Sequence, residues 1–142
     1  QPLSCCDPCL RDAVQPNKGA LSAAHSARIS ANAPKKISWS VDFDAATSKS
    51  FPEKARWDYI LQISTTSNDS STVAVEFHSI EETKVLKKRN DTEAILLSLC
   101  DPKPQIHRWI LVPEGATDGA SRITRQKLAQ RGIEVSSRQL SL

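Results

Sequence analysis

Apolar and polar residues alternate along several short segments of the chain, and this pattern predicts most of its strands. Residues 37–43 (ISWSVDF) alternate strictly, which predicts a strand with one buried face. Residues 57–64 (WDYILQIS) and 71–78 (STVAVEFH) are rich in β-branched and aromatic residues and flank a polar turn, so they predict a hairpin. The apolar run HRWILV at 107–112 predicts a strand covered on both faces, and 133–135 predicts a last strand. The positions expected to face inward on the first strand are Ile37, Trp39, Val41 and Phe43.

Helix signals fill the intervals between these strands. Asp7 followed by proline predicts a short helix, and Asp44 predicts another as its N-cap. Ser79 is expected to cap a long helix that runs to Leu99, with a kink or restart at Asn90-Asp91. A last helix should begin at Asp118 or Ser121 and end at Gly132, which suits a left-handed C-cap. Residues 19–29 are weakly helical.

This order predicts an α/β fold with a mixed central sheet flanked by helices. Three early strands followed by β-α-β, with right-handed crossovers, give α-β-β-β-α-β with a further α-β. We expect residues 1–36 to form a poorly defined segment of short helices packed on the core, and residues 37–142 to form a single domain.

Composition narrows the class of protein without choosing a function. The chain has 142 residues, 39% of them hydrophobic and 25% charged, as in globular proteins. No apolar run approaches the roughly 18 residues of a membrane span, and no signal pattern opens the sequence. We therefore expect a cytoplasmic protein with no membrane partner. The net charge of +3 is compatible with a polyanionic partner but does not demonstrate one.

The four cysteines are interpreted as reduced thiols. Cys6 and Cys9 have the spacing of half a zinc site or of a redox pair, but the second half is missing because Cys100 is alone. A zinc clip formed by Cys5, Cys6 and Cys9 is the less favoured interpretation. A metal-clipped or redox-regulated protein built on Cys5, Cys6 and Cys9 is a third, weaker hypothesis.

Polar residues on the hairpin provide the most informative chemistry. Glu76 and His78 share one face of the second strand because side chains alternate. A turn centred near Asn68 would place Asp58 opposite or diagonal to His78, within cross-strand reach of Glu76. The alternative to a functional cluster is a solvated strand face with an ordinary cross-strand ion pair.

Two basic groups accompany this cluster. Lys84, Lys87, Lys88 and Arg89 lie on the predicted long helix, where Glu81 and Glu82 could pair with them. Arg122, Arg125, Lys127 and Arg131 lie near the C-terminus. Both groups could contact phosphates, although a solvated helix surface is the ordinary explanation of such runs.

The element order, together with Asp58 at the start of one strand and Glu76-Phe77-His78 in the next, resembles the PD-(D/E)XK nuclease superfamily. The resemblance spans roughly residues 37–112. It implies a restriction-endonuclease-like core in which Asp58 and Glu76 bind Mg²⁺ or Mn²⁺ and His78 occupies the lysine position. Two departures are the histidine itself and Trp57 where the family has proline.

Because the family can move its lysine to the following helix, Lys84, Lys87 or Lys88 could serve instead, and Glu81 could be a further metal ligand. The chain is also similar to small bacterial proteins without a settled activity. The first hypothesis is thus a metal-dependent nuclease acting on DNA or RNA, with Asp58, Glu76, His78, Lys84 and Lys87 as its catalytic residues. The alternative is an inactive module of the same fold that binds protein or nucleic acid, perhaps as a homodimer.

Overall fold

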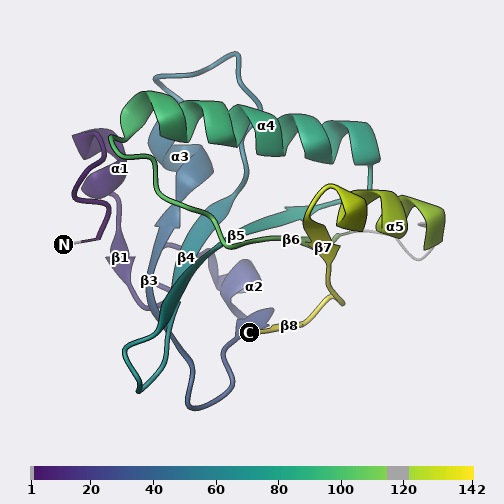
Figure 1. Cartoon of the computed structure of the whole chain (residues 1–142), viewed down its shortest axis with the longest axis horizontal. Helices are drawn as coiled ribbons and strands as arrows, with labels where there is room; N and C mark the ends of the chain where they lie inside the picture. The colour runs from purple at the N-terminus through teal and green to yellow at the C-terminus, as the bar shows by residue number, and fades with distance from the viewer. Residues whose placement is uncertain (1, 115–121) are drawn as a thin grey trace.

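A mixed sheet of six strands is the centre of the computed structural model, which describes residues 2–114 and 122–142 (Figure 1). Its strand order is β1-β3-β4-β5-β6-β7. The first four of these strands pair antiparallel, whereas β5, β6 and β7 pair in parallel. The strands are β1 (Gln15–Pro16), β3 (Lys36–Asp42), β4 (Tyr59–Ser64), β5 (Ser70–His78), β6 (Arg108–Pro113) and β7 (Ile133–Val135). The predicted mixed α/β architecture is confirmed.

Helices cover one face of this sheet. The long helix α4 (Glu82–Leu99) lies across the strands, with α1 (Pro8–Arg11) and α3 (Phe43–Thr47) near its C-terminal end and α5 (Arg122–Gln130) near its N-terminal end (Figure 1). Their apolar side chains form two buried clusters against the sheet, one around Ile60 and Leu96 and the other around Trp57 and Leu111. Among the described residues, none of the helices has the length and hydrophobicity needed to cross a bilayer.

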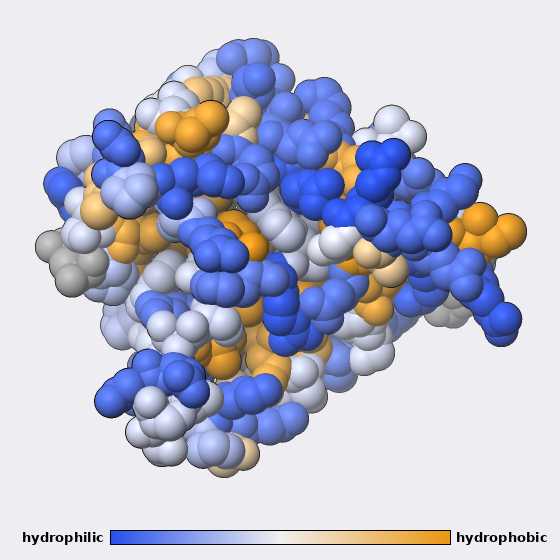
Figure 2. Space-filling model, in the orientation of Figure 1, coloured by the Kyte–Doolittle hydropathy of each residue, from blue (hydrophilic) through white to orange (hydrophobic). Residues whose placement is uncertain are grey.

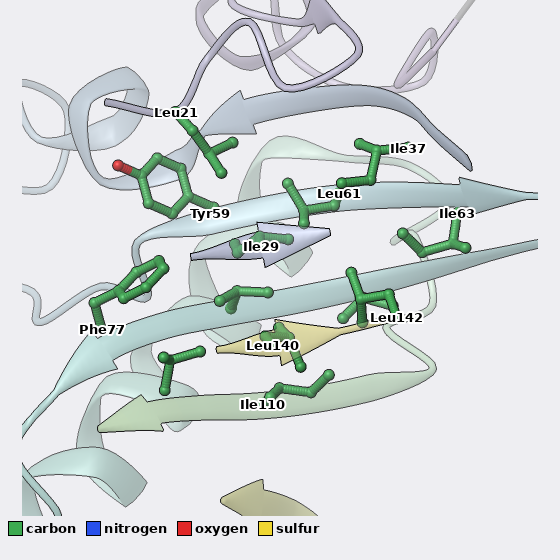
Figure 3. Close-up of a cluster of buried hydrophobic side chains, with 13 residues drawn as sticks. Leu21, Ile29, Ile37, Tyr59, Leu61, Ile63, Phe77, Ile110, Leu140 and Leu142 are labelled. Atoms are coloured by element: carbon green, nitrogen blue, oxygen red, sulfur yellow. The ribbon is translucent and has the colours of Figure 1, made fainter. Parts of the chain in front are cut away.

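The opposite face is covered by two short strands that come from distant parts of the chain. β2 (Ile29–Ser30), which follows the four-residue helix α2 (Ala23–Ser26), pairs in parallel with β8 (Leu140–Ser141). Together they close a third buried cluster, in which Ile29 and Leu140 pack against inward-facing residues of β4, β5 and β6 (Figure 3). The segment 1–36 thus supplies β1 to the main sheet and β2 to its cover.

An extra residue in β3 makes one detail of the predicted pattern wrong. Ile37 pairs with Ile63 but Trp39 pairs with Gln62, so Ser38 forms a β-bulge. Because a bulge shifts the alternation by one residue, Ile37 faces the β2-β8 layer while Trp39 faces α4. The four apolar residues predicted to share one face are therefore divided between two cores, and Phe43 already belongs to α3.

Several predicted helix boundaries also change. Asp42, not Asp44, is the N-cap of α3, where its side chain accepts a hydrogen bond from Ala45 N at 2.9 Å. The long helix begins after Glu81 rather than at Ser79, and it continues without interruption through residues 90 and 91. The weak helical signal at 19–29 yields only α2, while Gly132 has the predicted left-handed conformation, with φ of 80°. The predicted start of the last helix at Asp118 or Ser121 lies outside the described residues.

The prediction that all four cysteines are reduced thiols is wrong for two of them. Cys6 and Cys100 form a disulfide, and they are also antiparallel bridge partners. The N-terminal segment reaches the end of α4 through backbone hydrogen bonds, so two residues 94 positions apart become neighbours. The sequence spacing gave no sign of this packing. Cys5 and Cys9 remain free, and a zinc clip that includes Cys6 is not formed.

Candidate functional site

Asp58 and Glu76 lie side by side at the end of the sheet where β4 begins and β5 ends. The hairpin register pairs Tyr59 with Val75, which places Asp58 beside Glu76 rather than beside His78. The backbone N–H of Asp58 donates to Glu76 Oε1 at 2.9 Å, and the backbone N–H of Phe77 donates to Asp58 Oδ2 at 2.9 Å. The predicted cross-strand proximity of the two carboxylates is therefore present, and Asp58 is diagonal to His78, one of the two arrangements expected.

Neighbouring elements hold the entry to β4 from two sides. The backbone N–H of Trp57 donates to Thr92 Oγ1 of α4 at 2.8 Å. Two residues earlier, the backbone N–H of Ala55 donates to Asp91 Oδ2 at 2.9 Å. On the other side, the carbonyl oxygen of Asp58 accepts a hydrogen bond from Phe43 N–H at the start of α3. These contacts fix the backbone at residue 58, so its carboxylate has a defined position next to Glu76.

Glu76 is fully buried, and the one cationic partner that it has among the described residues is on α4. Its side chain lies on the helix-covered face with Ala74, and Lys88 Nζ donates to Glu76 Oε2 at 2.6 Å. Burial raises the pKa of Glu76, and the nearby negative charge of Asp58 raises it further, to about 8 in spite of Lys88. A fully buried carboxylate beside another carboxylate is costly to ionise, and this is where a further cation would be stabilised most.

Asp58 is only partly buried and remains the more accessible of the two carboxylates. Desolvation raises its pKa, while the hydrogen bond from Phe77 N–H and the charge of Lys88 oppose that rise. Within residues 2–114 and 122–142, no group donates a hydrogen bond to Asp58 Oδ1. This oxygen is therefore the one of the pair that could bind a cation.

The structure distinguishes among the candidate lysines. Lys88 contacts Glu76, whereas the Nζ atoms of Lys84 and Lys87 lie 3.2 Å from Glu81 Oε2 and 2.7 Å from Asp91 Oδ2 on the helix surface. The predicted roles of Lys84 and Lys87 at the carboxylates are not matched by their positions. Helical spacing could have identified Lys88, because it shares a stripe with Val85 and Thr92, which are both buried.

His78 and Glu81 lie apart from the carboxylate pair. His78 Nδ1 is 2.8 Å from the carbonyl oxygen of Ser79, so this nitrogen carries the proton and donates. Glu81 is paired with Lys84 and accepts a hydrogen bond from Ser79 Oγ. Among the described residues, no group of three or more His, Cys, Asp or Glu side chains is arranged to hold a metal ion. Asp58 and Glu76 are thus the two carboxylates that the fold brings together.

The sequence did not predict a role for His25 at the site, although it lies close to this end of the sheet. Its ring stacks on Phe77 with 3.9 Å between ring centroids, and its Nδ1 is 2.7 Å from Tyr59 Oη. It comes from α2, on the face opposite Lys88, and its charge acts on Asp58. No local pattern around His25 signals this position, because it depends on how α2 packs against β4 and β5.

An open cleft of about 690 Å³ lies at the carboxyl ends of β5 and β6. Crevices at this end of parallel strands are where α/β sheets commonly bind ligands. Arg28 crosses the cleft, donating to the carbonyl oxygen of Pro113 at 2.6 Å and approaching Glu114 Oε2 at 3.6 Å. The cleft is lined by Arg28, Ser79, Pro113, Glu114, Arg138 and Gln139.

Comparisons with protein-family models, with curated proteins and with solved structures found no match to this chain. The geometry of the site is therefore the basis for assigning a function.

Proposed function

We propose that this protein is a divalent-metal-dependent phosphodiesterase that acts on nucleic acid, built on a restriction-endonuclease-like core. The observation that carries the proposal is the convergence of Asp58, Glu76 and Lys88, from the start of β4, the end of β5 and the following helix. The element order supports it, because three antiparallel strands, a long helix and a parallel strand follow one another along the chain. This is the order that the resemblance to the PD-(D/E)XK superfamily implies.

Lys88 replaces the lysine that the family motif carries on the strand. His78 occupies that motif position but lies apart from the carboxylates, and Lys88 reaches Glu76 from α4. The roles that follow are Asp58 and Glu76 as ligands of Mg²⁺ or Mn²⁺, with Lys88 next to the bound phosphate. We assign no role to Glu81 at this site, because it pairs with Lys84.

The electrostatics of the pair suit a small divalent cation. Mg²⁺ and Mn²⁺ prefer carboxylate oxygens and bind through one or two of them together with waters. Such an ion lowers the pKa of bound water and offsets charge on a phosphate. Binding it would relieve the repulsion between Asp58 and Glu76, which contributes to the raised pKa of Glu76. Lys88 is about one quarter exposed, so its ammonium can also turn toward a ligand.

A specific observation favours the second candidate, an inactive module of the same fold. Three of the four carboxylate oxygens of Asp58 and Glu76 already accept hydrogen bonds from protein groups. A polar network as complete as this can fix the hairpin against α4 with no chemistry at all.

Nicking of supercoiled plasmid in Mn²⁺, Mg²⁺ or EDTA tests the first proposal. We expect metal-dependent nicking by the wild type and a loss of about a hundredfold or more in Glu76→Gln and in Lys88→Met. Lys84→Met is the matched control, because it removes the same charge from the same helix without touching Glu76, and it should retain activity. Nicking by Glu76→Gln at the wild-type rate would refute the proposal.

Calorimetric titration with Mn²⁺ separates the two candidates. The enzyme should bind Mn²⁺ and lose that binding in Asp58→Asn, with its circular dichroism spectrum unchanged. A folded wild type that binds no Mn²⁺ would indicate the inactive module.

A further inference from the structure

The basic residues of α5 differ from most of the other charged groups in how they are paired. Elsewhere in the described chain, eight lysines and arginines form ion pairs with carboxylates. None of those pairs involves Arg122, Arg125 or Lys127 of α5, or Arg131 directly after it. Four positive charges thus occupy ten consecutive residues without a carboxylate partner among residues 2–114 and 122–142. The eight paired residues are Arg11, Arg28, Arg56, Lys84, Lys87, Lys88, Lys103 and Arg108.

The charge at the N-terminal end of α5 opposes helix stability, whereas Lys127 in the last turn favours it. The first turn of α5 contains no acidic residue and begins with Arg122, although positive charge is unfavourable at a helix N-terminus. Arg122 with Arg125, and Lys127 with Arg131, are like charges three and four residues apart, where they repel. The helix is held instead by Leu128, which is fully buried against the sheet. Helix stability therefore does not account for Arg122 or for the like-charged pairs.

The basic surface continues from α5 toward the candidate site. Arg89 of α4 donates to the carbonyl oxygen of Arg131 at 2.8 Å, and its guanidinium lies 5.9 Å from the centroid of the Trp109 ring. Arg89 directly follows Lys88, which contacts Glu76. Arg122, Lys127 and Arg131 are exposed and Arg89 and Arg125 are partly exposed, and Figure 2 shows predominantly hydrophilic surface over α4 and α5.

We propose that this surface, defined by Arg89, Arg122, Arg125, Lys127 and Arg131 and called here the α5 face, binds the phosphate backbone of a nucleic-acid duplex. The proposal deepens the proposed function and rests on it for the choice of a nucleic acid. Guanidinium groups bind phosphate oxygens through paired hydrogen bonds, and lysines neutralise phosphates as point charges. At 3.6 residues per turn, Arg122 and Arg125 lie on one flank of α5 and Lys127 and Arg131 on the other, with Leu128 buried beneath, so successive phosphates of a duplex can meet charges on both sides of the exposed surface of the helix.

Other polyanions fit the α5 face less well. A single strand needs exposed aromatic rings on which to stack its bases. The large hydrophobic residues exposed in the described chain are Leu97 and Ile123, and neither is aromatic. A membrane helix needs an exposed apolar face. On α5 only Ile123 is a large exposed apolar residue, because Leu128 is turned into the core.

Binding of a fluorescein-labelled 20-base-pair DNA duplex to the full chain tests the proposal, with fluorescence anisotropy as the measurement. Titrations in EDTA at 50 to 200 mM KCl keep hydrolysis out of the experiment. The test variant neutralises the face with Arg125→Gln, Lys127→Gln and Arg131→Gln. The matched control carries Lys35→Gln, Lys36→Gln and Lys49→Gln, at exposed positions away from α5. Both triple variants reduce the formal net charge from +3 to zero.

We expect the α5 variant to lose at least about tenfold in duplex affinity at 100 mM KCl, and the salt slope to decrease by about 2 to 3. The control should lose less than about threefold. Equal losses in the two variants would overturn the proposal, and so would a wild type with no salt-dependent duplex binding. Tighter binding to vesicles of 30% phosphatidylserine than to the duplex would also overturn it, in favour of a membrane.

The binding and nicking assays fail independently. Glu76→Gln should retain duplex binding in EDTA while losing nicking, because Glu76 is not part of the α5 face. Duplex binding without nicking in the wild type would therefore refute the enzyme and leave the α5 face supported. Nicking that does not depend on the α5 residues would refute duplex binding by the α5 face and leave the enzyme supported.

Discussion

Replacing Glu76 with glutamine preserves the shape of the buried side chain but removes its ability to ionise. The pKa of Glu76 is raised in the folded protein from 4.5 to about 8, mainly by burial and then by the charge of Asp58. At low pH the carboxyl is neutral in both folded and unfolded chains. As pH rises above about 4.5 the unfolded chain ionises first, so the folded state loses stability until the pH passes about 8. The whole displacement corresponds to at most about 5 kcal/mol.

Urea denaturation followed by tryptophan fluorescence, from pH 5 to 8.5 with the disulfide intact, measures this effect. Near pH 5 the wild type and Glu76→Gln should agree in free energy of unfolding to within about 1 kcal/mol, since glutamine resembles a protonated glutamate. Near pH 8.5 the glutamine variant should be the more stable by about 3 to 5 kcal/mol. Subtracting the two proteins removes most of the contribution of other titrating groups, which both contain.

Glu134 provides the control with the opposite sign. Hydrogen bonds from Arg108, at 2.8 and 2.9 Å, lower the pKa of Glu134, so its contribution is lost as pH falls rather than as pH rises. Glu134→Gln should therefore gain no stability between pH 5 and 8.5. Parallel stability profiles for the wild type and Glu76→Gln would show that the Glu76 carboxyl ionises normally, and the reasoning about the buried pair would fail.

Three further predictions concern the elements that support the site. Lys88→Met should raise the pKa of Glu76 further and lower the free energy of unfolding by no more than about 1 kcal/mol at pH 8, because the carboxyl can stay protonated without its cationic partner, whereas Lys84→Met should leave the urea midpoint unchanged. Leu96→Ala should cost about 3 kcal/mol in the same assay, and Leu97→Ala, at a residue 69% exposed, less than about 0.5 kcal/mol. Cys100→Ser should lower the free energy of unfolding by about 2 to 5 kcal/mol, because it opens a disulfide that spans 94 positions. Mass spectrometry of the alkylated wild type should find two free thiols, and four would contradict the structure.

The hairpin shows how far local sequence could predict the site. Strand alternation placed Glu76 on the face away from Phe77, and the structure confirms it. The register places Asp58 opposite Glu76 and diagonal to His78, which is one of the two expected arrangements, with the turn centred one position before Asn68. Both arrangements keep every side chain on its face, so the proximity of Asp58 to Glu76 did not depend on the exact centre of the turn.

Tertiary packing determined the features of the site and fold that local sequence could not predict. The choice of Lys88 over Lys84 and Lys87 depends on which side of α4 meets the sheet. The neighbouring buried residues could have shown that side, but charge composition could not. The position of His25 and the pairing of Cys6 with Cys100 depend on contacts between segments far apart in the chain. No local pattern encodes such contacts.

The bulge at Ser38 allows β3 to serve two cores. A single unpaired residue turns the segment before it toward the β2-β8 layer and the segment after it toward α4. The loop before β3 can change length with little effect on which side chains are buried, but the distance in sequence from Ile37 to Trp39 cannot. Related chains that keep this architecture should therefore conserve the length of this short interval more strictly than the identity of the residue within it.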